Sequence, residues 1–423
     1  MNSKNKLLKF IFQLLIFLMP TQLALHFWPS WAHVFGIRVD YLAPTLYLTD
    51  LLLIVLIIAW INPLIRNLYA LRLKPYAVIL GFSILVFAVL NSAFAPVPAV
   101  SILKWLKVGE LAFFVYFVKN FKKLETNKLV RPISFSLILF GIIGIVQFLK
   151  GASLGGVFYF LGERTFSLGT PSISTMAIFG REYLMPYSTF PHPNSLAGYF
   201  LVSTIFLLGS VKKSDYKLVL ISLFVAVVTL ILTFSLGVAV ALVCCLILFF
   251  VRRNLAIGIF FTVFLLSLIS PIFIHNPSGL YSESYFRRAV LIESAGKMIS
   301  NSPLLGVGLN NFLVKLPEKG DYPSVTWWLQ PVHNIFLLVF AETGIVGLLF
   351  FFYLIFRAFN KSLETGNPST LLGMVSLSNH WKLEIALLAI LITGVVDHYW
   401  LTLQQNQLLF ALVLGLSLRK QKS

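Results

Sequence analysis

The chain has 423 residues, of which 58% are hydrophobic and only 11% are charged, and its mean hydropathy is +0.88. Because soluble domains carry about 25% charged residues, this composition excludes a soluble globular protein. The basic residues behind the formal net charge of +18 lie mostly in the segments between apolar stretches. This distribution is typical of membrane topology, so no nucleic-acid partner is expected.

Apolar stretches long enough to cross a bilayer core, which needs about 20 residues per helix, recur along the whole chain. We predict an all-α, polytopic integral membrane protein with about 12 transmembrane helices. They are expected near residues 7–28, 43–62, 75–94, 102–120, 132–150, 194–210, 217–234, 237–251, 254–275, 332–357, 383–399 and 402–418. The first stretch lacks a clear small-residue cleavage site, which indicates an uncleaved anchor rather than a signal peptide.

Lysine and arginine gather in the segments that lie on the same side as the N-terminus when the helices are counted in order. The positive-inside rule therefore predicts that both termini are cytoplasmic. We expect one membrane domain over residues 1–423, with outer excursions at 151–193 and 276–331, the second between helices 9 and 10. Segments longer than ordinary connections usually carry function.

A helix with an unpaired arginine is predicted early in the second excursion. Arg288 shares a helical face with Ile292 and Ile299. Its neighbour Arg287 has Glu283 four residues before it and can form a helix ion pair, whereas Arg288 has no acid at helical spacing. Arg288 is thus a candidate anion ligand. The alternative is an interfacial helix whose arginine reaches lipid headgroups.

Two predicted helices run from the outer to the inner side and begin with histidine and asparagine. Asn194, after the His-Pro pair that ends the first excursion, is a plausible N-cap. Helix N-termini present free N–H groups and a positive dipole end, which suit a phosphate. Each histidine alone also fits a structural interfacial residue. The expected outer anion site comprises Arg181, Arg288, His192, Asn194, His333 and Asn334.

Other catalytic patterns are absent from the sequence. It contains no Gly-rich phosphate loop and no nucleophile elbow. Cys244 and Cys245 are adjacent inside a predicted span, and no metal-ligand spacing is found, so neither a metal nor a cofactor is expected. Ionisable residues within spans are functional candidates by default. They are Asp50, Lys104, Lys107, Glu110, Glu342 and Asp397.

Three segments resemble the bacterial O-antigen ligase and polysaccharide polymerase superfamily. They are "RRAVLIESAGKMISNSPLLGVGLNNF" at 287–312, "HNIFLLVFAETGIVGLLFF" at 333–351 and "STFPHPNSLAGYF" at 188–200. The first resembles the family's arginine helix and Pro-Leu-Leu-Gly-Val-Gly turn, and the second its His-Asn helix. Similarity in detail covers about 180–200 and a ligase-related core at 217–355.

The resemblance implies an inverting, metal-independent glycosyltransferase in the bacterial cytoplasmic (inner) membrane. Such a protein moves a glycan from an undecaprenyl-diphosphate carrier to a hydroxyl of a glycan, lipid or protein acceptor at the outer membrane face. Carried onto this chain, His333 is the base and Arg288 a diphosphate ligand, with Arg181 as a further expected ligand. His192, Asn194, Asn334 and Glu342 are expected supporting residues.

One departure from the family pattern and two alternatives remain. The family often has an arginine at the outer turn between helices seven and eight, where this chain has Leu236. Either another cation, such as Arg181 or Arg38, fills this role, or the protein handles a different leaving group or is a weakly active paralogue. A transporter or flippase is the main alternative function, although no repeated halves are found. A different polyprenyl-dependent transferase would use Asp40 or Asp321 as its base.

Overall fold

The computed structural model describes most of the chain. The described residues are 3–70, 75–121, 126–208, 213–250, 258, 264, 265, 268, 283–319, 329–363 and 379–419. The predicted ninth helix, 254–275, lies almost wholly outside them, as do Asp321 and much of the predicted inner loop 358–382.

The structure is predominantly helical, with 71% of residues in helices. Apart from the ninth, each predicted span overlaps a helix. The helices are α1 Ser3–Leu18, α2 Leu48–Ala70, α3 Pro75–Ala93, α4 Pro98–Asn120, α5 Val130–Lys150, α6 Pro193–Leu208, α7 Tyr216–Leu232, α8 Leu236–Phe250, α10 Glu283–Asn301, α11 Phe312–Lys319, α12 Ile335–Leu363, α13 Asn379–Val396, α14 Tyr399–Thr402 and α15 Gln404–Ser417. Proline at the first position starts α3, α4 and α6, where its missing N–H costs no hydrogen bond.

The all-α expectation needs correction in the segments between α1 and α2 and between α5 and α6. The first helix ends at Leu18 rather than near residue 28, and short antiparallel pairs follow it. The strands are β1 Ala24–His26, β2 His33–Val34, β3 Ile37–Arg38, β4 Thr45–Tyr47, β5 Thr175–Ile178 and β6 Arg181–Leu184, paired β1–β4, β2–β3 and β5–β6. Alternation over so few residues is too short a signal to predict from sequence.

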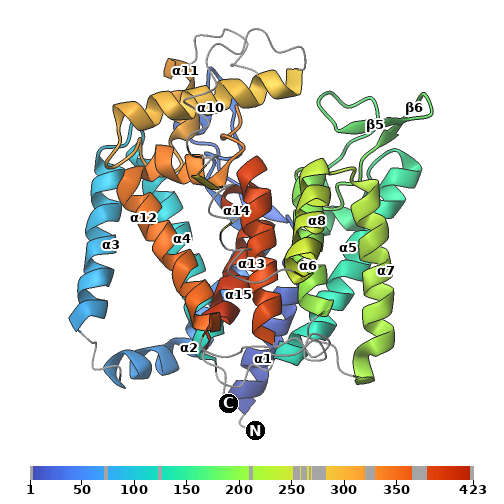
Figure 1. Ribbon diagram of the computed structural model, residues 1–423, viewed down its shortest axis with the longest axis horizontal. Helices are drawn as coiled ribbons and strands as arrows, with labels where there is room; N and C mark the ends of the chain where they lie inside the picture. Colours follow the sequence, from blue (N-terminus) through green and yellow to red (C-terminus); the bar gives the residue numbers. More distant parts are fainter. Residues whose placement is uncertain are drawn as a thin grey trace.

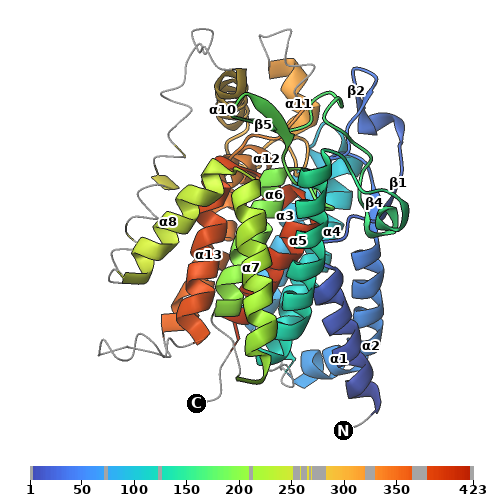
Figure 2. The ribbon, with the colours of Figure 1, turned by 90° about the vertical axis from the view of Figure 1, so that its right-hand side faces the viewer.

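Two described helices are long and apolar enough to cross a membrane. They are Val130–Lys150 and Ile335–Phe359, with mean hydropathies of 2.2 and 2.4, and shorter apolar helices accompany them. Both chain ends lie at the same end of the helix bundle, and α10, α11 and the β5–β6 hairpin lie at the opposite end (Figures 1 and 2). The count of twelve spans and the cytoplasmic side of the termini stay predictions.

Reporter fusions test this sidedness. A fusion after Lys213, in a basic segment before α7, should report the cytoplasm, and a fusion after Lys319, at the end of α11, should report the outer side. A cytoplasmic signal at Lys319 would contradict the orientation and would place α10 on the wrong face of the membrane.

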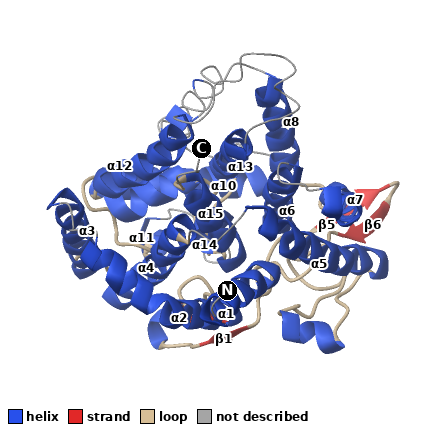
Figure 3. Ribbon diagram, turned by 90° about the horizontal axis from the view of Figure 1, so that it is seen from below, coloured by secondary structure: helices blue, strands red, loops and turns tan. Residues whose placement is uncertain are grey.

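The last long helix, α15, forms the centre of the bundle. Every residue from Gln404 to Ser417 is buried, and α15 contacts α4, α6, α12 and α13. Seen along the bundle, it lies inside the ring of the other helices (Figure 3). Its first turn carries amide side chains; Gln404 Nε2 donates to Asp50 Oδ1 at 2.6 Å, so a buried carboxylate on α2 is satisfied by the central helix.

The turn after α10 docks on a break in α12. Gly344 interrupts that helix with φ 63° and ψ −168°. The N–H of Ile345 donates to the carbonyl of Pro303 at 2.8 Å. A Cβ at Gly344 would lie 2.2 Å from the Leu304 carbonyl oxygen. Glycine is therefore required both by the positive φ and by the close backbone approach.

Asn91 of α3 holds the same turn from the other side. Its Nδ2 donates to the carbonyls of Leu305 at 2.8 Å and Glu342 at 3.0 Å. Its Oδ1 accepts the Leu309 N–H and the Trp105 indole N–H, each at 2.9 Å. All four hydrogen-bonding positions of a buried amide are used, so the turn after α10 is held against α3, α4 and α12.

Gly344→Ala should destabilise the protein. Left-handed strain on a non-glycine residue costs about 1–3 kcal/mol, and the Leu304 carbonyl must also move. Thermal unfolding in detergent should show a lower Tm for this variant. Gly81→Ala is the control, because a Cβ at Gly81 of α3 meets nothing within 4 Å. Equal Tm values for the two variants would contradict the docking argument.

Candidate functional site

His333 lies at the entrance to α12, next to the residue that caps the helix. Asn334 is 4% exposed, and its Oδ1 accepts the backbone N–H groups of Phe336 at 2.9 Å and Leu337 at 3.1 Å. This is an N-cap, as its residue type favours. The side chain of Asn334 is thereby occupied. His333 is free of the capping role, and its Nδ1 is buried with no hydrogen-bond partner among the described residues.

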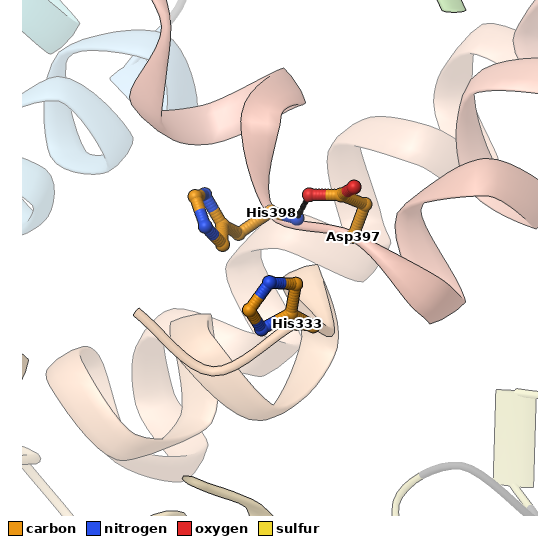
Figure 4. Close-up of side chains that lie close together, drawn as sticks. All are labelled: His333, Asp397 and His398. Carbon is orange, nitrogen blue, oxygen red and sulfur yellow. Dashed lines mark hydrogen bonds between the residues drawn. The ribbon is translucent and has the colours of Figure 1, made fainter. Parts of the chain in front are cut away.

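The turn that follows α13 brings an acid and a second histidine to His333. The ligating atoms of His333, Asp397 and His398 lie within 4.8 Å of one another. The two imidazole rings are 5.1 Å apart between centroids, and His333 faces the Asp397–His398 turn (Figure 4). Asp397 Oδ1 accepts the backbone N–H of His398 at 2.8 Å, which fixes the carboxylate within the turn.

The start of α6 completes this cluster. Asn194 Nδ2 donates to Asp397 Oδ2 at 3.2 Å. Asn194 is therefore not the N-cap that the sequence suggested. The helix begins one residue earlier, at Pro193, and His192 Nδ1 accepts the backbone N–H of Asn194 at 3.1 Å. The interpretation failed because a preceding histidine ring can satisfy the free N–H as well as an asparagine oxygen can.

Gln147 of α5 positions the segment between α5 and α6 that leads to His192. Its Oε1 accepts the N–H of Ser188 at 2.6 Å, and its Nε2 donates to Glu163 Oε1 at 2.7 Å. Glu163 in turn accepts the N–H groups of Leu154 and Gly155, each at 2.7 Å. A buried amide and a buried carboxylate thus hold both ends of this loop against α5.

The environment of His333 favours a neutral imidazole. Burial lowers the pKa of His333 below its usual value because a charged ring would lose hydration. The positive charge of Arg288 lowers this pKa further, and the negative charge of Asp397 acts in the opposite direction. At neutral pH the ring therefore has one nitrogen lone pair available to accept a proton or to bind a cation.

The predicted cations differ in their relation to His333. Arg288 is half-buried on α10 and acts electrostatically on both His333 and His192. Arg181 is exposed on β6, with its guanidinium 5.4 Å from the centroid of the Tyr183 ring. No described contact joins Arg181 to His333.

Arg164 is a cation at the site that sequence reasoning did not assign. Its Nη2 donates to the Pro191 carbonyl at 2.7 Å, and its charge acts on His192. Its guanidinium lies 5.4 Å from the centroid of the Tyr187 ring. The chain offers no local signal for this position, because the loop's fold alone brings residue 164 next to residue 191.

Glu342 of α12 contacts the turn between α10 and α11. Its backbone carbonyl accepts the N–H of Gly308 at 3.0 Å, and the N–H groups of Asn310 and Phe312 interact with its carboxylate. Lys104 of α4 lies within electrostatic range of the same carboxylate. These contacts connect the start of α11 to α12, so Glu342 holds the scaffold rather than facing the cluster around His333.

The sequence did not predict that Asp397 and His398 lie together at the site. Asp397 was recognised only as an ionisable residue within a span, because the predicted helix 383–399 included it. In the structure α13 ends at Val396, which places both side chains in the turn beyond the helix. The structure also brings together three potential metal-ligand side chains that no spacing in the sequence indicated. The ligand types come from distant segments, where spacing in sequence carries no information.

Asp40 lies near the same site, although its side chain is exposed. Its charge acts on Arg164 and on the adjacent Tyr41. The ring of Tyr41 lies 5.6 Å from that of His398, centroid to centroid. Asp40 therefore stays an alternative base.

Comparison with known proteins adds one match. Residues 217–352 match the sequence model of the O-antigen ligase family. No curated protein matches the chain. The matched segment contains α7, α8, the cation-bearing helix α10, the docked turn and the His-Asn start of α12. It therefore supports placing this chain in the O-antigen ligase and polysaccharide polymerase superfamily, whose proteins transfer glycans at membranes.

Proposed function

We propose that the protein is an inverting glycosyltransferase of the ligase or polymerase type. It moves a glycan from an undecaprenyl-diphosphate carrier to an acceptor hydroxyl at the outer face of the cytoplasmic membrane. The observation that carries this proposal is the convergence of a neutral histidine, a fixed carboxylate and a nearby arginine at the end of the bundle opposite the chain ends.

In the proposed reaction, His333 accepts the proton of the acceptor hydroxyl. The hydroxyl oxygen forms a bond to the anomeric carbon, and the bond from that carbon to the diphosphate oxygen breaks with its electron pair leaving on the diphosphate. Attack opposite to the leaving group inverts the configuration. Asp397, within 4.8 Å of His333, stabilises the imidazolium that forms.

The leaving diphosphate requires positive charge that is already in place. Arg288 is proposed to bind it, because guanidinium matches phosphate oxygens in a bidentate manner. Arg164 provides a second cation near His192. It is a candidate for the charge absent at Leu236, where α8 begins. Arg181 on the β5–β6 hairpin remains a proposed further ligand of the diphosphate.

Reconstituted vesicles test the proposal. The purified protein, a polyprenyl-diphosphate-linked glycan and a glycan or lipid acceptor should give a new glycosidic product and free polyprenyl diphosphate. A ligase would add one block per acceptor, and a polymerase would give a ladder. Donor movement between leaflets without any new glycosidic bond would instead establish the transporter or flippase alternative.

A further inference from the structure

The His333–Asp397–His398 cluster has the composition of a transition-metal site. Two imidazoles and one carboxylate converge from two chain segments, with their ligating atoms within 4.8 Å of one another. Asp397 is 8% and His398 5% exposed, so both ligands are removed from bulk water. Histidine nitrogen with one carboxylate is a donor set that zinc accepts in tetrahedral sites, with the fourth position left open.

Neighbouring groups hold His398 and Asp397 in ligating form. His398 Nδ1 lies 2.8 Å from Thr402 Oγ1, and that hydroxyl also donates to the His398 carbonyl at 3.1 Å. Nδ1 is then the protonated nitrogen, and the lone pair lies on Nε2. Asn194 fixes one oxygen of Asp397. Metal-ligating histidines and carboxylates are commonly oriented by hydrogen bonds to neighbouring groups of this kind.

We propose that His333, Asp397 and His398 bind a Zn²⁺ ion, and that this ion inhibits the glycan transfer proposed above. The inhibition rests on that proposed function, and the binding does not. Coordination uses the lone pair with which His333 would accept the proton of the acceptor hydroxyl. Zn²⁺ and the acceptor therefore compete for one nitrogen.

The geometry indicates reversible binding. Donor atoms of a tetrahedral zinc site with Zn–N near 2.0–2.1 Å are roughly 3.3 Å apart, so the three side chains must close from within 4.8 Å. The positive charge of Arg288 at His333 opposes a second cation. Both effects should make this site weaker than a preformed structural zinc site.

Zinc binding is measured first, on the purified full-length protein in detergent, without donor or acceptor. Isothermal titration with ZnCl₂ should give one site per chain. His398→Gln and Asp397→Asn should each weaken the zinc affinity by more than about 10-fold. Removing a neighbour that only hydrogen-bonds to a metal ligand already costs about 10–100-fold in metal affinity. His33→Gln is the matched control, because His33 lies in β2 and its Nδ1 interacts with the Pro29 carbonyl. Unchanged zinc affinity in both cluster variants would overturn the site.

X-ray absorption of the zinc-loaded wild type needs no variant. Nitrogen and oxygen neighbours at about 2.0–2.2 Å are expected, and sulfur at about 2.3 Å would assign the ion to the cysteines and overturn the proposal.

The transfer assay then separates the two proposals. Zinc should inhibit the wild type and His33→Gln equally, and a chelator should restore the rate. Loss of transfer on chelation would overturn the inhibitory role. If zinc binds at the cluster while His333→Ala still transfers glycan, the zinc site stands and the proposed base fails. If His333→Ala loses transfer and no zinc binds, the base stands and the zinc site fails.

Discussion

Replacing His333 by alanine should reduce glycan transfer by about 10²–10⁴-fold, the usual contribution of a positioned base. Donor binding should be retained, because the proposed diphosphate ligand is Arg288 on α10, a separate element. The fold should also be retained, since Nδ1 of His333 has no hydrogen-bond partner among the described residues and its removal orphans no other group. Transfer rate and donor affinity are measured separately in vesicles.

Asn334→Ala is the neighbouring control. Its side chain caps α12 through two backbone N–H groups, so its loss should cost about 1 kcal/mol of stability and should change the rate much less than His333→Ala. Near-normal transfer by His333→Ala would remove the base assignment. Asp40, whose charge acts on Arg164, would then be the next residue to replace, followed by Asp321.

Arg288→Ala should lose most of the transfer activity, and Arg288→Lys should keep part of it. Lysine retains the charge but lacks the planar fork that grips a phosphate with two hydrogen bonds. Removing a charge-assisted hydrogen bond costs about 1.5–3 kcal/mol, which corresponds to at least a 10-fold weaker donor affinity. Donor binding should be measured directly, because the loss is expected there as well as in the rate.

Lys297→Ala is the control on the same helix. The ammonium of Lys297 lies 3.0 Å from Glu293, one helical turn before it, so its charge is already paired. Half-exposed helix pairs of this kind contribute little, and donor affinity should change only slightly. Equal, small losses in Arg288→Ala and Lys297→Ala would favour the interfacial helix in which Arg288 serves only lipid headgroups.

The helices were predictable because bilayer-length apolar runs leave few alternatives. The predicted boundaries of α3, α5 and α7 lie within two residues of those observed. The short strands were not predictable. Their register depends on pairing between residues such as Ala24 and Tyr47, across a segment that has little periodicity of its own.

The candidate site was predictable only in part. His333 and Arg288 lie in motifs whose neighbouring residues carry the resemblance, and Asn334 has the residue type of a cap. Asp397 could not be assigned, because its importance arises from a contact with Asn194 and from proximity to His333, residues far away in the chain. The helix boundary at Val396 decides whether Asp397 lies in a span or at the site, and boundaries are the least predictable feature.

The central position of α15 constrains how this protein is made. Synthesis proceeds from the N-terminus, so α15 leaves the ribosome after the helices that it contacts. Until then α4, α6 and α12 lack the surface on which they pack. The carboxylate of Asp50 also lacks the hydrogen bond from Gln404. The helices on either side of the Asp397 turn, α13 and α14, lack their contacts with α15. A chain truncated before residue 404 should therefore insert its earlier helices but remain a protease-sensitive assembly, because the bundle packs fully only around α15.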